Sequence, residues 1–345
     1  MTKEVAVVIL NWNGKTFLEK FLPKVIEFSP NAEIIIADNQ SLDDSVQFLQ
    51  ENYPSIQIII NESNGGFAKG YNDALKKVKA KYYLLLNSDI EVTEGWLEPL
   101  VESLKIEDVV ACQPKILSFD QKNQFEHAGA CGGFLDKNYY PFCRGRILEN
   151  TEIDKNQYDF VQEIFWASGA CLLIQADIFH KLGGFDEDFF AHMEEIDLCW
   201  RLKKRNYKIY VNPNSIVYHV GGGTLNYMSP FKTYLNFRNS LFMILKNHEG
   251  FYFFKIFKRL LLDGIAGIFF LIQGNPKHTI SVIKAHFSFY KLFFKMLNKR
   301  NKIKQESTKF NSTGLYNGNI LWAKYFKKIT SFSKLNLRLF SKYKL

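Results

Sequence analysis

The sequence contains no apolar run long enough to cross a bilayer. A membrane-spanning helix needs about 20 predominantly apolar residues, whereas Gly264–Ile272, the longest uncharged apolar stretch of the aromatic C-terminal region, is far shorter. The first apolar run, Val5–Leu10, leads directly into a polar loop, so we expect no N-terminal signal peptide. Any contact of this chain with a membrane is therefore expected to be peripheral.

The cysteines do not predict a disulfide framework. The five residues, at positions 112, 131, 143, 171 and 199, are odd in number and include no C-x-x-C pair. Such a set is typical of reduced and mostly buried thiols, which persist in the cytosol. We therefore expect a cytoplasmic protein.

Two common nucleotide-binding signatures are also missing. A dinucleotide fold places G-x-G-x-x-G after its first strand, but only Gly14 follows the run Val5–Leu10. The run Gly65–Gly70 fails the same test, because Phe67 stands where the middle glycine belongs. No G-x-x-x-x-G-K-[ST] phosphate loop occurs anywhere in the sequence. These absences exclude the standard dinucleotide enzymes and the P-loop proteins.

What the sequence does contain is a series of apolar runs that end in asparagine or aspartate. Continuous apolar runs of this length predict strands buried on both faces. The runs, each with the polar residue that follows it, are Val5–Leu10 with Asn11, Ile34–Ala37 with Asp38, Ile56–Ile60 with Asn61, and Tyr82–Leu86 with Asn87. Helical patterns separate them, at residues 16–28, 45–53 and 68–78. This alternation predicts an α/β fold with a parallel sheet whose polar strand ends face one crevice.

The last of these runs ends in Asn87-Ser88-Asp89, which places a carboxylate at the predicted crevice. In open α/β sheets, ligands bind just beyond the carboxyl ends of the strands. A carboxylate there can hold Mg²⁺ or Mn²⁺, and such an ion commonly bridges to substrate phosphates. An aspartate that only caps the next helix is the alternative interpretation. Four polar strand ends together favour a binding site.

These residues resemble family 2 glycosyltransferases, which are nucleotide-sugar-dependent enzymes of the GT-A fold, and most of all the rhamnosyltransferase branch of that family. The resemblance covers roughly residues 5–247. The segments that carry it are Val8–Gly14, Asp38-Asn39 with Ser41 and Asp43, Asn64–Asn72, Leu85–Asp89, Ser168–Cys171, Gly183–Asp186, Glu194–Arg201, Tyr218-His219 and Arg238–Leu241.

The resemblance implies a Rossmann-like, mostly parallel central sheet flanked by helices. Residues 1–229 are expected to form the catalytic domain, with a nucleotide-binding half at 1–90 and an acceptor and catalytic half at 91–229. Residues 118–163 are polar and are expected to form an irregular insertion near the acceptor side. The residues expected to contact the donor nucleotide are Asn11, Asn13, Asp38, Asn39, Asn64, Gly66, Phe67, Asn72, Asn87 and Ser88.

The segment from Glu194 to Leu202 has helical spacing and begins with two acids. Glycosyl transfer needs a base that accepts the proton of the acceptor hydroxyl, although acids in a first turn are also favoured by the helix dipole alone. By its match to the second acid of the family motif, Glu195 is assigned as the base, with Glu194 and Asp197 as supports. A single base acting by in-line displacement implies inversion. The expected acceptor contacts are Trp166, Gly169, Asp186 and His192.

The resemblance also implies that Asp89 and His219 bind a divalent cation, Mg²⁺ or Mn²⁺. Two positions depart from the family pattern. The metal motif of the family usually opens with aspartate, where this chain has Asn87. The base motif is usually Glu-Asp, where this chain has Glu194-Glu195, and the longer side chain changes the reach of the second carboxylate.

The net charge of +9 is divided unevenly along the chain. Residues 1–229 carry 22 Lys and Arg against 32 Asp and Glu, a net charge of −10, while residues 230–345 carry 22 against 3, a net charge of +19. Residues 230–297 contain aromatic amphipathic stretches, and a basic tail is expected at 298–345. This pattern is typical of helices that lie on an anionic membrane surface. Packing on the core, or a dimer interface, is the alternative.

Three functions remain open on the sequence alone. The favoured one is an inverting, metal-dependent transferase that moves a sugar, with rhamnose favoured, from a nucleoside-diphosphate sugar to a glycan or lipid-linked acceptor at the inner face of the cell membrane. The alternatives are a sugar nucleotidyltransferase and an inactive glycan-binding protein. We expect no nucleic-acid partner, because no RNA- or DNA-binding motif accompanies the basic region.

Overall fold

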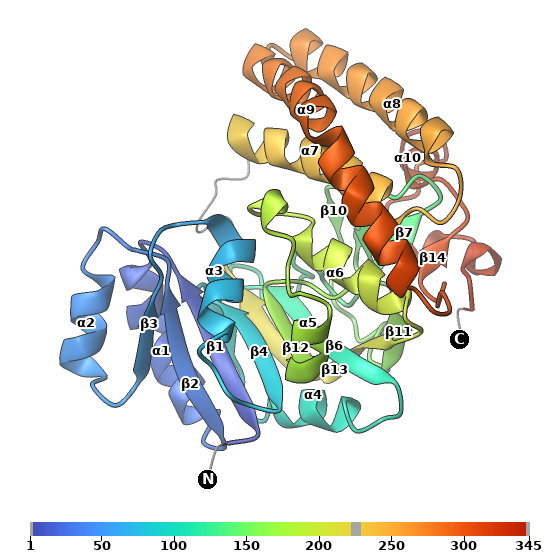
Figure 1. Cartoon of the computed structure of the whole chain (residues 1–345). Helices are drawn as coiled ribbons and strands as arrows, with labels where there is room; N and C mark the ends of the chain where they lie inside the picture. The colour runs from blue at the N-terminus through green and yellow to red at the C-terminus, as the bar shows by residue number, and fades with distance from the viewer. Residues whose placement is uncertain (1–2, 222–228, 343–345) are drawn as a thin grey trace.

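The computed structural model describes residues 3–221 and 229–342. It contains a large mixed sheet flanked by helices, a small second sheet, and three long C-terminal helices that lie along one side of the body (Figure 1). The α/β class predicted from the sequence is confirmed.

The N-terminal half of the large sheet consists of four parallel strands, as predicted. In spatial order they are β3 (Gln57–Ile60), β2 (Ala32–Asp38), β1 (Val5–Asn11) and β4 (Tyr82–Asn87). Asn11 is in register with Asp38, and Leu10 is in register with Asn87. The polar strand ends therefore meet at one edge of the sheet.

Three helices connect these strands close to the expected positions: α1 (Lys15–Glu27), α2 (Ser45–Asn52) and α3 (Gly66–Leu75). Alternate residues of β1 pack on opposite sides of the sheet. Val7 belongs to the apolar cluster that includes Leu18 of α1, while Val8 belongs to the cluster that includes Ala68 of α3. Both faces are covered, which is why the strands consist of continuous apolar residues.

The other half of the large sheet runs in both directions. Its strands are β5 (Ile90–Val92), β6 (Val109–Ser118), β11 (Gln162–Ile164), β12 (Cys171–Gln175) and β13 (Lys208–His219). β12 lies antiparallel between β4 and β6, and β13 is parallel to β6. The end of β13 pairs with β5 so that His219 is opposite Ile90. This register brings His219 beside Asp89, the residue before β5.

Residues 118–163, expected to be irregular, contribute most of the second sheet instead. The spatial order is β10 (Asn150–Thr151), β9 (Arg146–Ile147), β8 (Pro141–Cys143), β7 (Gly133–Asp136) and β14 (Leu315–Tyr316). The prediction was wrong because these strands have only two to four residues each, too short for a period to appear in the sequence.

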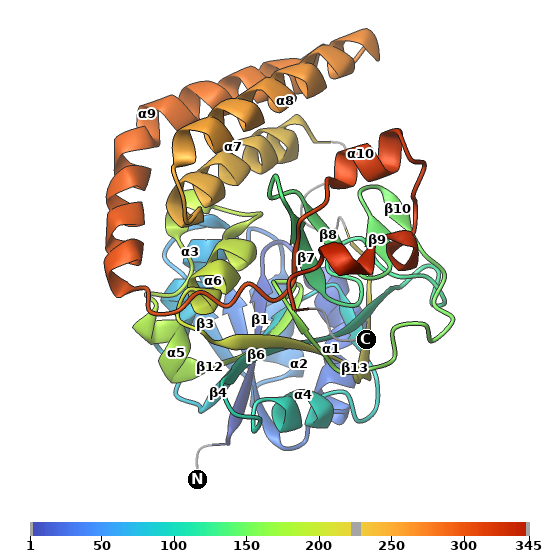
Figure 2. The ribbon, with the colours of Figure 1, turned by 90° about the vertical axis from the view of Figure 1, so that its right-hand side faces the viewer.

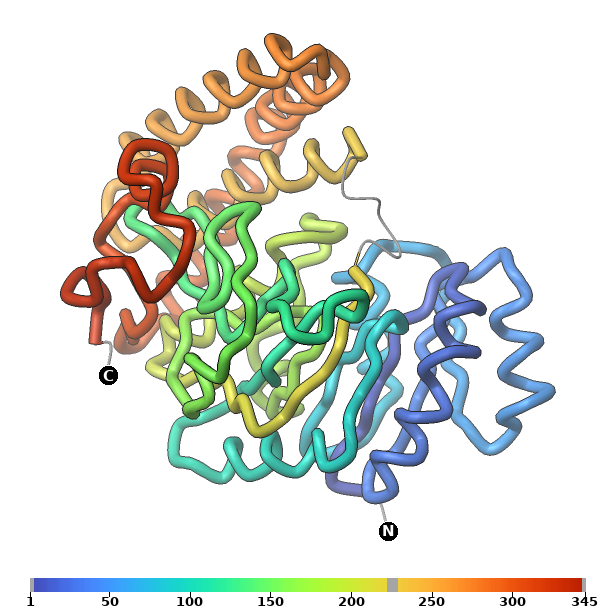
Figure 3. The backbone as a smooth tube through the Cα atoms, turned by 180° about the vertical axis from the view of Figure 1, so that it is seen from behind, coloured from blue at the N-terminus to red at the C-terminus, as the bar shows by residue number. Residues whose placement is uncertain are grey.

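The region expected to be a basic tail packs against this second sheet. β14 pairs with β7, and Phe332 and Phe340 stack against Phe134 and Phe142. Views from two further directions show the C-terminal segment in red beside the green strands (Figures 2 and 3). The remaining short elements here are α10 (Ile320–Tyr325), η2 (Phe332–Lys334) and η3 (Leu337–Leu339).

The long C-terminal helices are α7 (Pro230–Asn247), α8 (Tyr252–Ile272) and α9 (Pro276–Glu306). The expected boundary at residue 298 falls inside α9 and does not mark the end of an element. In the described residues, no helix is both long enough and apolar enough to span a membrane. The shorter helices of the body are α4 (Glu98–Ser103), α5 (Ala176–Lys181), η1 (Glu187–Phe189) and α6 (Glu194–Lys203).

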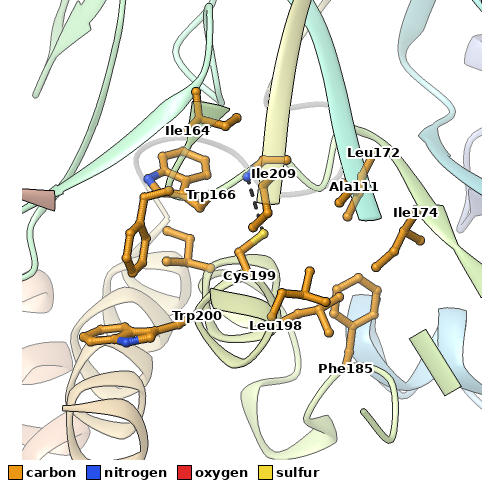
Figure 4. Close-up of a cluster of buried hydrophobic side chains, with 14 of the residues drawn as sticks. Ala111, Ile164, Trp166, Leu172, Ile174, Phe185, Leu198, Cys199, Trp200 and Ile209 are labelled. Carbon is orange, nitrogen blue, oxygen red and sulfur yellow. Dashed lines mark hydrogen bonds between the residues drawn. The ribbon is translucent and has the colours of Figure 1, made fainter. Parts of the chain in front are cut away.

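Helix α6 is held against the large sheet by an apolar cluster (Figure 4). Leu198, Cys199 and Trp200 are buried, and the Cys199 thiol accepts a hydrogen bond of 3.4 Å from the backbone N–H of Ala167. All five cysteines are buried and free, as predicted. Because this face of α6 is packed so closely, the position of its first turn, which carries the two glutamates, is fixed.

Candidate active site

A cavity of about 980 Å³ opens at the edge where the parallel strands end. Most of the predicted site residues line it: Asn39, Asn64, Gly66, Phe67, Asn87, Ser88, Asp89, Trp166, Gly169, His192, Glu194, Glu195 and His219. The predicted residues that do not line it are Asn11, Asn13, Asp38, Asn72, Asp186 and Asp197.

The wall formed by the nucleotide-binding half is held together by amide side chains. Asn39 donates from Nδ2 to Asn64 Oδ1 and to the carbonyl of Gly66, each at 3.0 Å. Its own Oδ1 accepts from Asn61 Nδ2 at 3.0 Å. The loops that follow β2 and β3 are thereby tied to one another. We call this surface, made by Asn39, Asn64, Gly66 and Asn87, the donor wall.

Four of the predicted donor residues lie behind this wall. Asn11 donates to Asp38 Oδ2 at 2.9 Å, and Asn13 accepts a backbone hydrogen bond from the loop after β2. Asn72 donates to the carbonyl of Phe185 at 2.9 Å and accepts from its N–H at 3.0 Å. Their side chains fix the loops of the site, and the structure does not bring them to the cavity.

Asp89 and His219 lie together at the base of the cavity. His219 Nε2 is 3.2 Å from Asp89 Oδ1, and His219 Nδ1 is 3.2 Å from Glu126 Oε2. All three side chains are almost fully buried. Burial alone would lower the pKa of His219, but the charges of Asp89 and Glu126 outweigh it and raise the pKa to about 10. The imidazole is therefore held between two carboxylates.

Asp89 and His219 fit a divalent cation. Mg²⁺ is commonly bound by one or two side chains together with the oxygens of a substrate phosphate. Glu126 contacts the second ring nitrogen of His219, which is how a carboxylate orients a metal-binding imidazole. In the described parts of the chain, no three His, Cys, Asp or Glu residues converge on one point. Two protein ligands completed by a bound phosphate are the set that fits here.

Glu194 and Glu195 begin α6 and face the cavity. Glu194 is only 4% exposed, whereas Glu195 is half-buried. Within the described residues, the Oε2 atom of each is buried without a hydrogen-bond partner. Burial raises the pKa of Glu195 to about 7, and burial together with the charge of Glu195 raises the pKa of Glu194 well above its usual value. Of the two acids, Glu195 is the one whose raised pKa lies close to neutral pH.

The loop before α6 has an unusual backbone. The φ angles of Phe190, His192 and Met193 are 66°, 69° and 73°. Residues other than glycine rarely adopt this region of backbone conformation. Phe190, with ψ of −66°, forms a three-residue γ-turn closed by a 2.8 Å hydrogen bond from Ala191 N–H to the carbonyl of Phe189. Such strain persists only where the surrounding structure enforces it, and it concentrates at functional sites.

Two side chains of α7 enforce this conformation, and the sequence analysis gave them no role. Asn239 donates from Nδ2 to the carbonyls of Phe189, Ala191 and His192 at 2.7–2.9 Å. Arg238 donates from Nη2 to the carbonyls of residues 188 and 189 at 3.0 and 2.9 Å. The family resemblance included Arg238 and Asn239 as a motif. It did not predict their contact with this loop, because the two segments are far apart in the sequence.

Asp197 and Asp186, predicted as a support for the base and as an acceptor contact, form ion pairs away from the cavity. Asp197 is fully buried, with Arg201 Nε at 2.9 Å and Lys246 Nζ at 2.8 Å. Asp186 pairs with the same Lys246 at 2.6 Å and with Lys299. Both carboxylates therefore attach α6 and the loop before it to α7 and α9.

On the acceptor side, Trp166 and Gly169 line the cavity close to the glutamates. The Trp166 indole N–H donates to the carbonyl of Phe134 at 3.0 Å, so only its ring faces the cavity. A Cβ at Gly169 would lie 3.1 Å from Phe67 and 3.6 Å from Glu195 Cβ. The absence of a side chain at Gly169 leaves the space in front of Glu195 open.

Three basic side chains that the sequence analysis left without a role also line the cavity: His127, Arg146 and Lys232. They come from the segment before β7, from β9 of the second sheet, and from α7. No local pattern marks them, because the second sheet and the C-terminal helices bring them to the site.

Residues 6–183, just over half of the chain, match the model of glycosyl transferase family 2. The chain is 23% identical over 259 residues to the N-acetylglucosaminyl-diphospho-decaprenol L-rhamnosyltransferase of Mycobacterium tuberculosis, covering 65% of this chain and 78% of that protein. It is 23% identical over 220 residues to the rhamnosyltransferase WbbL of Escherichia coli K12, covering 61% and 80%.

The fold is similar to that of solved glycosyltransferases. GalNAc-T7, crystallised with UDP, GalNAc and Mn²⁺, gives a TM-score of 0.58 at 15% identity, covering 95% of this chain and 57% of that one. The mannosyltransferase PcManGT of Pyrobaculum calidifontis, in complex with GDP-Man and Mn²⁺, gives 0.50 at 12% identity, covering 88% and 86%. The architecture is GT-A-like, and the chain belongs to glycosyl transferase family 2.

Proposed function

We propose that this protein is an inverting, metal-dependent glycosyltransferase that moves rhamnose from a nucleoside-diphosphate sugar to a hydroxyl of a glycan or lipid-linked acceptor in cell-surface polysaccharide synthesis. The observation that carries the proposal is that one cavity holds the acidic pair Glu194 and Glu195 together with Asp89 and His219. Rhamnose is favoured because two relatives are named as rhamnosyltransferases, and a lipid-linked acceptor because one of these names includes diphospho-decaprenol.

In this proposal Glu195 is the general base. It accepts the proton of the acceptor hydroxyl while the hydroxyl oxygen forms a bond to the anomeric carbon, and the bond from that carbon to the diphosphate breaks with its electron pair going to the diphosphate. A base works best when its pKa is close to the operating pH, and the pKa of about 7 at Glu195 meets that requirement. Attack opposite the leaving group inverts the anomeric centre.

The remaining groups bind and orient the substrates. A divalent cation held by Asp89 and His219 would supply positive charge for the departing diphosphate. The donor wall offers amide and backbone groups to the nucleotide, and Asn39 fixes their spacing. The Trp166 ring provides an apolar surface for the acceptor sugar.

The two other candidate functions are less well supported. A sugar nucleotidyltransferase resembles G-x-G-x-R after its first strand, where this chain has Asn11-Trp12-Asn13-Gly14. An inactive glycan-binding protein does not need a buried carboxylate whose oxygen has no partner in the described residues, as Glu195 has, because such a group lowers stability without serving binding.

The test is incubation of the full chain with a panel of nucleotide-sugars, including deoxythymidine-diphosphate rhamnose, and Mn²⁺. We expect slow hydrolysis to free sugar and nucleoside diphosphate, strongest with the rhamnose donor. Asp89→Asn should abolish it, while the matched change Asp177→Asn, at an exposed position on α5, should leave it intact. Nucleotide exchange with a sugar 1-phosphate would favour the nucleotidyltransferase, and donor binding without turnover would favour the inactive protein.

We further propose that the enzyme acts at the inner face of the cell membrane and is bound there peripherally. Six apolar side chains of α8 are exposed and spaced three or four residues apart: Phe254, Phe257, Leu261, Ile265, Ile268 and Ile272. We call this row the α8 stripe. It lies on one of the two helices that project above the body in Figures 1 and 2. An apolar row on a basic helical segment is typical of an interfacial membrane anchor.

A further inference from the structure

Arg146 is a buried cation that lines the cavity and forms no ion pair with a carboxylate of the described residues. It is only 6% exposed, and its Nη1 donates to the carbonyl of Leu148 at 3.0 Å, while its Nη2 is 3.5 Å from Cys143 Sγ. Its Nε atom has no partner within residues 3–221 and 229–342. Within the described residues no carboxylate forms an ion pair with Arg146, and Glu126 contacts His219. A buried charge without a counter-ion is unfavourable.

The neighbours of Arg146 include a second cation, Lys232, and burial lowers the pKa values of His127 and Lys232 while the charge of Glu126 acts on both to raise them. His127 Nε2 is 3.5 Å from Arg146 Nη1, and burial together with the charge of Arg146 lowers the pKa of His127 to about 3, so that the imidazole is neutral. Lys232 of α7 lines the same part of the cavity. Its charge also lowers the pKa of His127 and that of His192. This end of the cavity therefore attracts anions.

The adjacent arginine shows that burial alone does not create such a site. Arg144 is fully buried, but it donates to the carbonyl of Cys131 at 2.9 Å and to Gln162 Oε1 at 2.7 Å, and its guanidinium lies over the rings of Tyr158 and Phe160. Arg144 does not line the cavity. Its donors are used in holding the second sheet together, whereas Arg146 lines the cavity and its Nε atom has no partner within the described residues.

Apolar side chains continue the cavity wall beyond the two cations. Leu148 follows Arg146, and Phe231 and Phe270 come from α7 and α8. Phe270 stands on the same helix as the α8 stripe. A cationic pair beside an apolar wall suits a ligand with an anionic group and an apolar chain.

We propose that Arg146 and Lys232 form a subsite for a phosphate or diphosphate group of the acceptor, with Leu148, Phe231 and Phe270 contacting the chain that carries it. The inference rests on the proposed function and deepens it, because it assigns the acceptor class as a phosphorylated lipid. A guanidinium binds phosphate oxygens through two parallel hydrogen bonds, and lysine adds a point charge. The donor carries a diphosphate too, so the experiment must separate the two sources.

The experiment is titration calorimetry of the full chain with farnesyl diphosphate, and separately with a nucleoside diphosphate and Mn²⁺. Arg146→Gln should weaken the binding of farnesyl diphosphate by about 10- to 100-fold, the range expected when charge-assisted hydrogen bonds are lost. It should change nucleoside diphosphate binding by less than about twofold. The matched control is Lys284→Gln, which removes one positive charge from an exposed position on α9.

Lys232→Gln is the second variant and should also weaken the binding of farnesyl diphosphate more than that of the nucleoside diphosphate. It keeps the test decisive if thermal denaturation shows that Arg146→Gln does not fold. Farnesol, which has the chain without the diphosphate, should bind far more weakly than farnesyl diphosphate. The inference would be overturned if both variants bind farnesyl diphosphate as tightly as the wild type, or if the wild type does not bind it. An equal loss for the nucleoside diphosphate would assign the subsite to the donor. If the wild type binds no nucleoside diphosphate at all, the proposed function itself fails.

Discussion

The donor wall differs from the part of the cavity lined by His192, Glu194 and Glu195, which we call the acidic wall, in how its polar groups are hydrogen-bonded. On the donor wall, neutral amides bond to one another, and Asn39 joins the loop after β2 to the loop after β3 through three hydrogen bonds. On the acidic wall, buried atoms of His192, Glu194 and Glu195 have no partner in the described residues. The amide oxygen of Asn61 also lacks a partner in the part of the chain that the structure describes, but an unpaired neutral group costs much less than an unpaired carboxylate.

The difference indicates how the site divides its work. Amides that are already bonded keep a binding surface in place without charge, so the donor wall is set before substrate arrives. Carboxylates without partners have pKa values shifted into the range useful for proton transfer. Substitutions on the two walls should therefore have different effects. Those at Glu194 and Glu195 should lower the transfer rate, whereas those on the donor wall should change substrate affinity or have little effect.

The largest effect is expected for Glu195→Gln. The transfer rate should fall by roughly 10²- to 10⁴-fold, the usual contribution of a positioned general base, while donor affinity stays close to that of the wild type. Glu194→Gln is the matched control and should cost less. If Glu194→Gln lowers the transfer rate more than Glu195→Gln does, Glu194 is the base and Glu195 its support. If both variants lose donor binding, the two acids serve folding rather than proton transfer.

The same variant should change the pH dependence. Because burial raises the pKa of Glu195 to about 7, the wild-type rate should rise with pH through about 7 as the carboxylate ionises. The raised pKa also means that the ionised side chain disfavours the folded state, so stability falls as pH rises above the unfolded value. Glu195→Gln should therefore gain melting temperature relative to the wild type at pH 8 but not at pH 4. An unchanged difference between these two pH values would contradict the shift.

The strained loop gives the second prediction. Asn239→Ala removes three hydrogen bonds to the carbonyls of residues 189, 191 and 192. The loop should relax and misplace the first turn of α6, with a loss of about 10²-fold in rate, the order expected for a displacement of about 1 Å. Donor affinity should stay within a few-fold. Asn301→Ala, at an exposed position on α9, is the control, and a loss confined to melting temperature would make Asn239 only a stabilising residue.

What could be predicted from the sequence follows the range of the interactions involved. The parallel strands and their polar ends are local patterns, and so is the pair of acids that begins α6. Arg146 could not be found in this way, because a two-residue strand of the second sheet brings it to the cavity. Glu126 could not be found either, because the irregular segment between β6 and β7 places it beside His219. The three hydrogen bonds of Asn239 could not be predicted either, because their acceptors are carbonyls almost 50 residues earlier in the chain.

The membrane prediction changes once the fold is known. Truncation near residue 298 would cut α9, which ends at Glu306, and Lys324 of the supposed tail lies 3.0 Å from Glu149. The exposed α8 stripe is the better target. We expect a triple variant, Phe254→Ser with Ile265→Ser and Ile268→Ser, to bind anionic vesicles at least tenfold more weakly. A tenfold loss corresponds to about 1.4 kcal/mol, which is well below the free energy that three apolar side chains contribute when they are buried.

Vesicle co-sedimentation at low and high salt measures this effect. The wild type should bind anionic vesicles more strongly than neutral ones, because each lysine near the surface adds about 1 kcal/mol at most and salt screens it. Lys327→Gln with Lys328→Gln is the charge control and should weaken binding less than the stripe variant. Unchanged binding by the stripe variant, together with a concentration-dependent dimer in sedimentation, would assign the stripe to contact between two copies of the chain.

The smallest effect is expected on the donor wall, at Asn87. Its backbone N–H bonds to the carbonyl of Ala170 at 2.9 Å, so the position of the residue does not depend on its side chain, which lines the cavity close to Asp89 in sequence. Asn87→Asp should leave transfer within a few-fold and tighten Mn²⁺ binding by a similar factor, because a second carboxylate adds a hard oxygen ligand at nearly unchanged size. Manganese titration followed by donor hydrolysis measures both quantities. A loss beyond tenfold would show that the Asn87 amide donates a hydrogen bond that a carboxylate cannot supply, and the donor wall would then contribute to rate as well as to affinity.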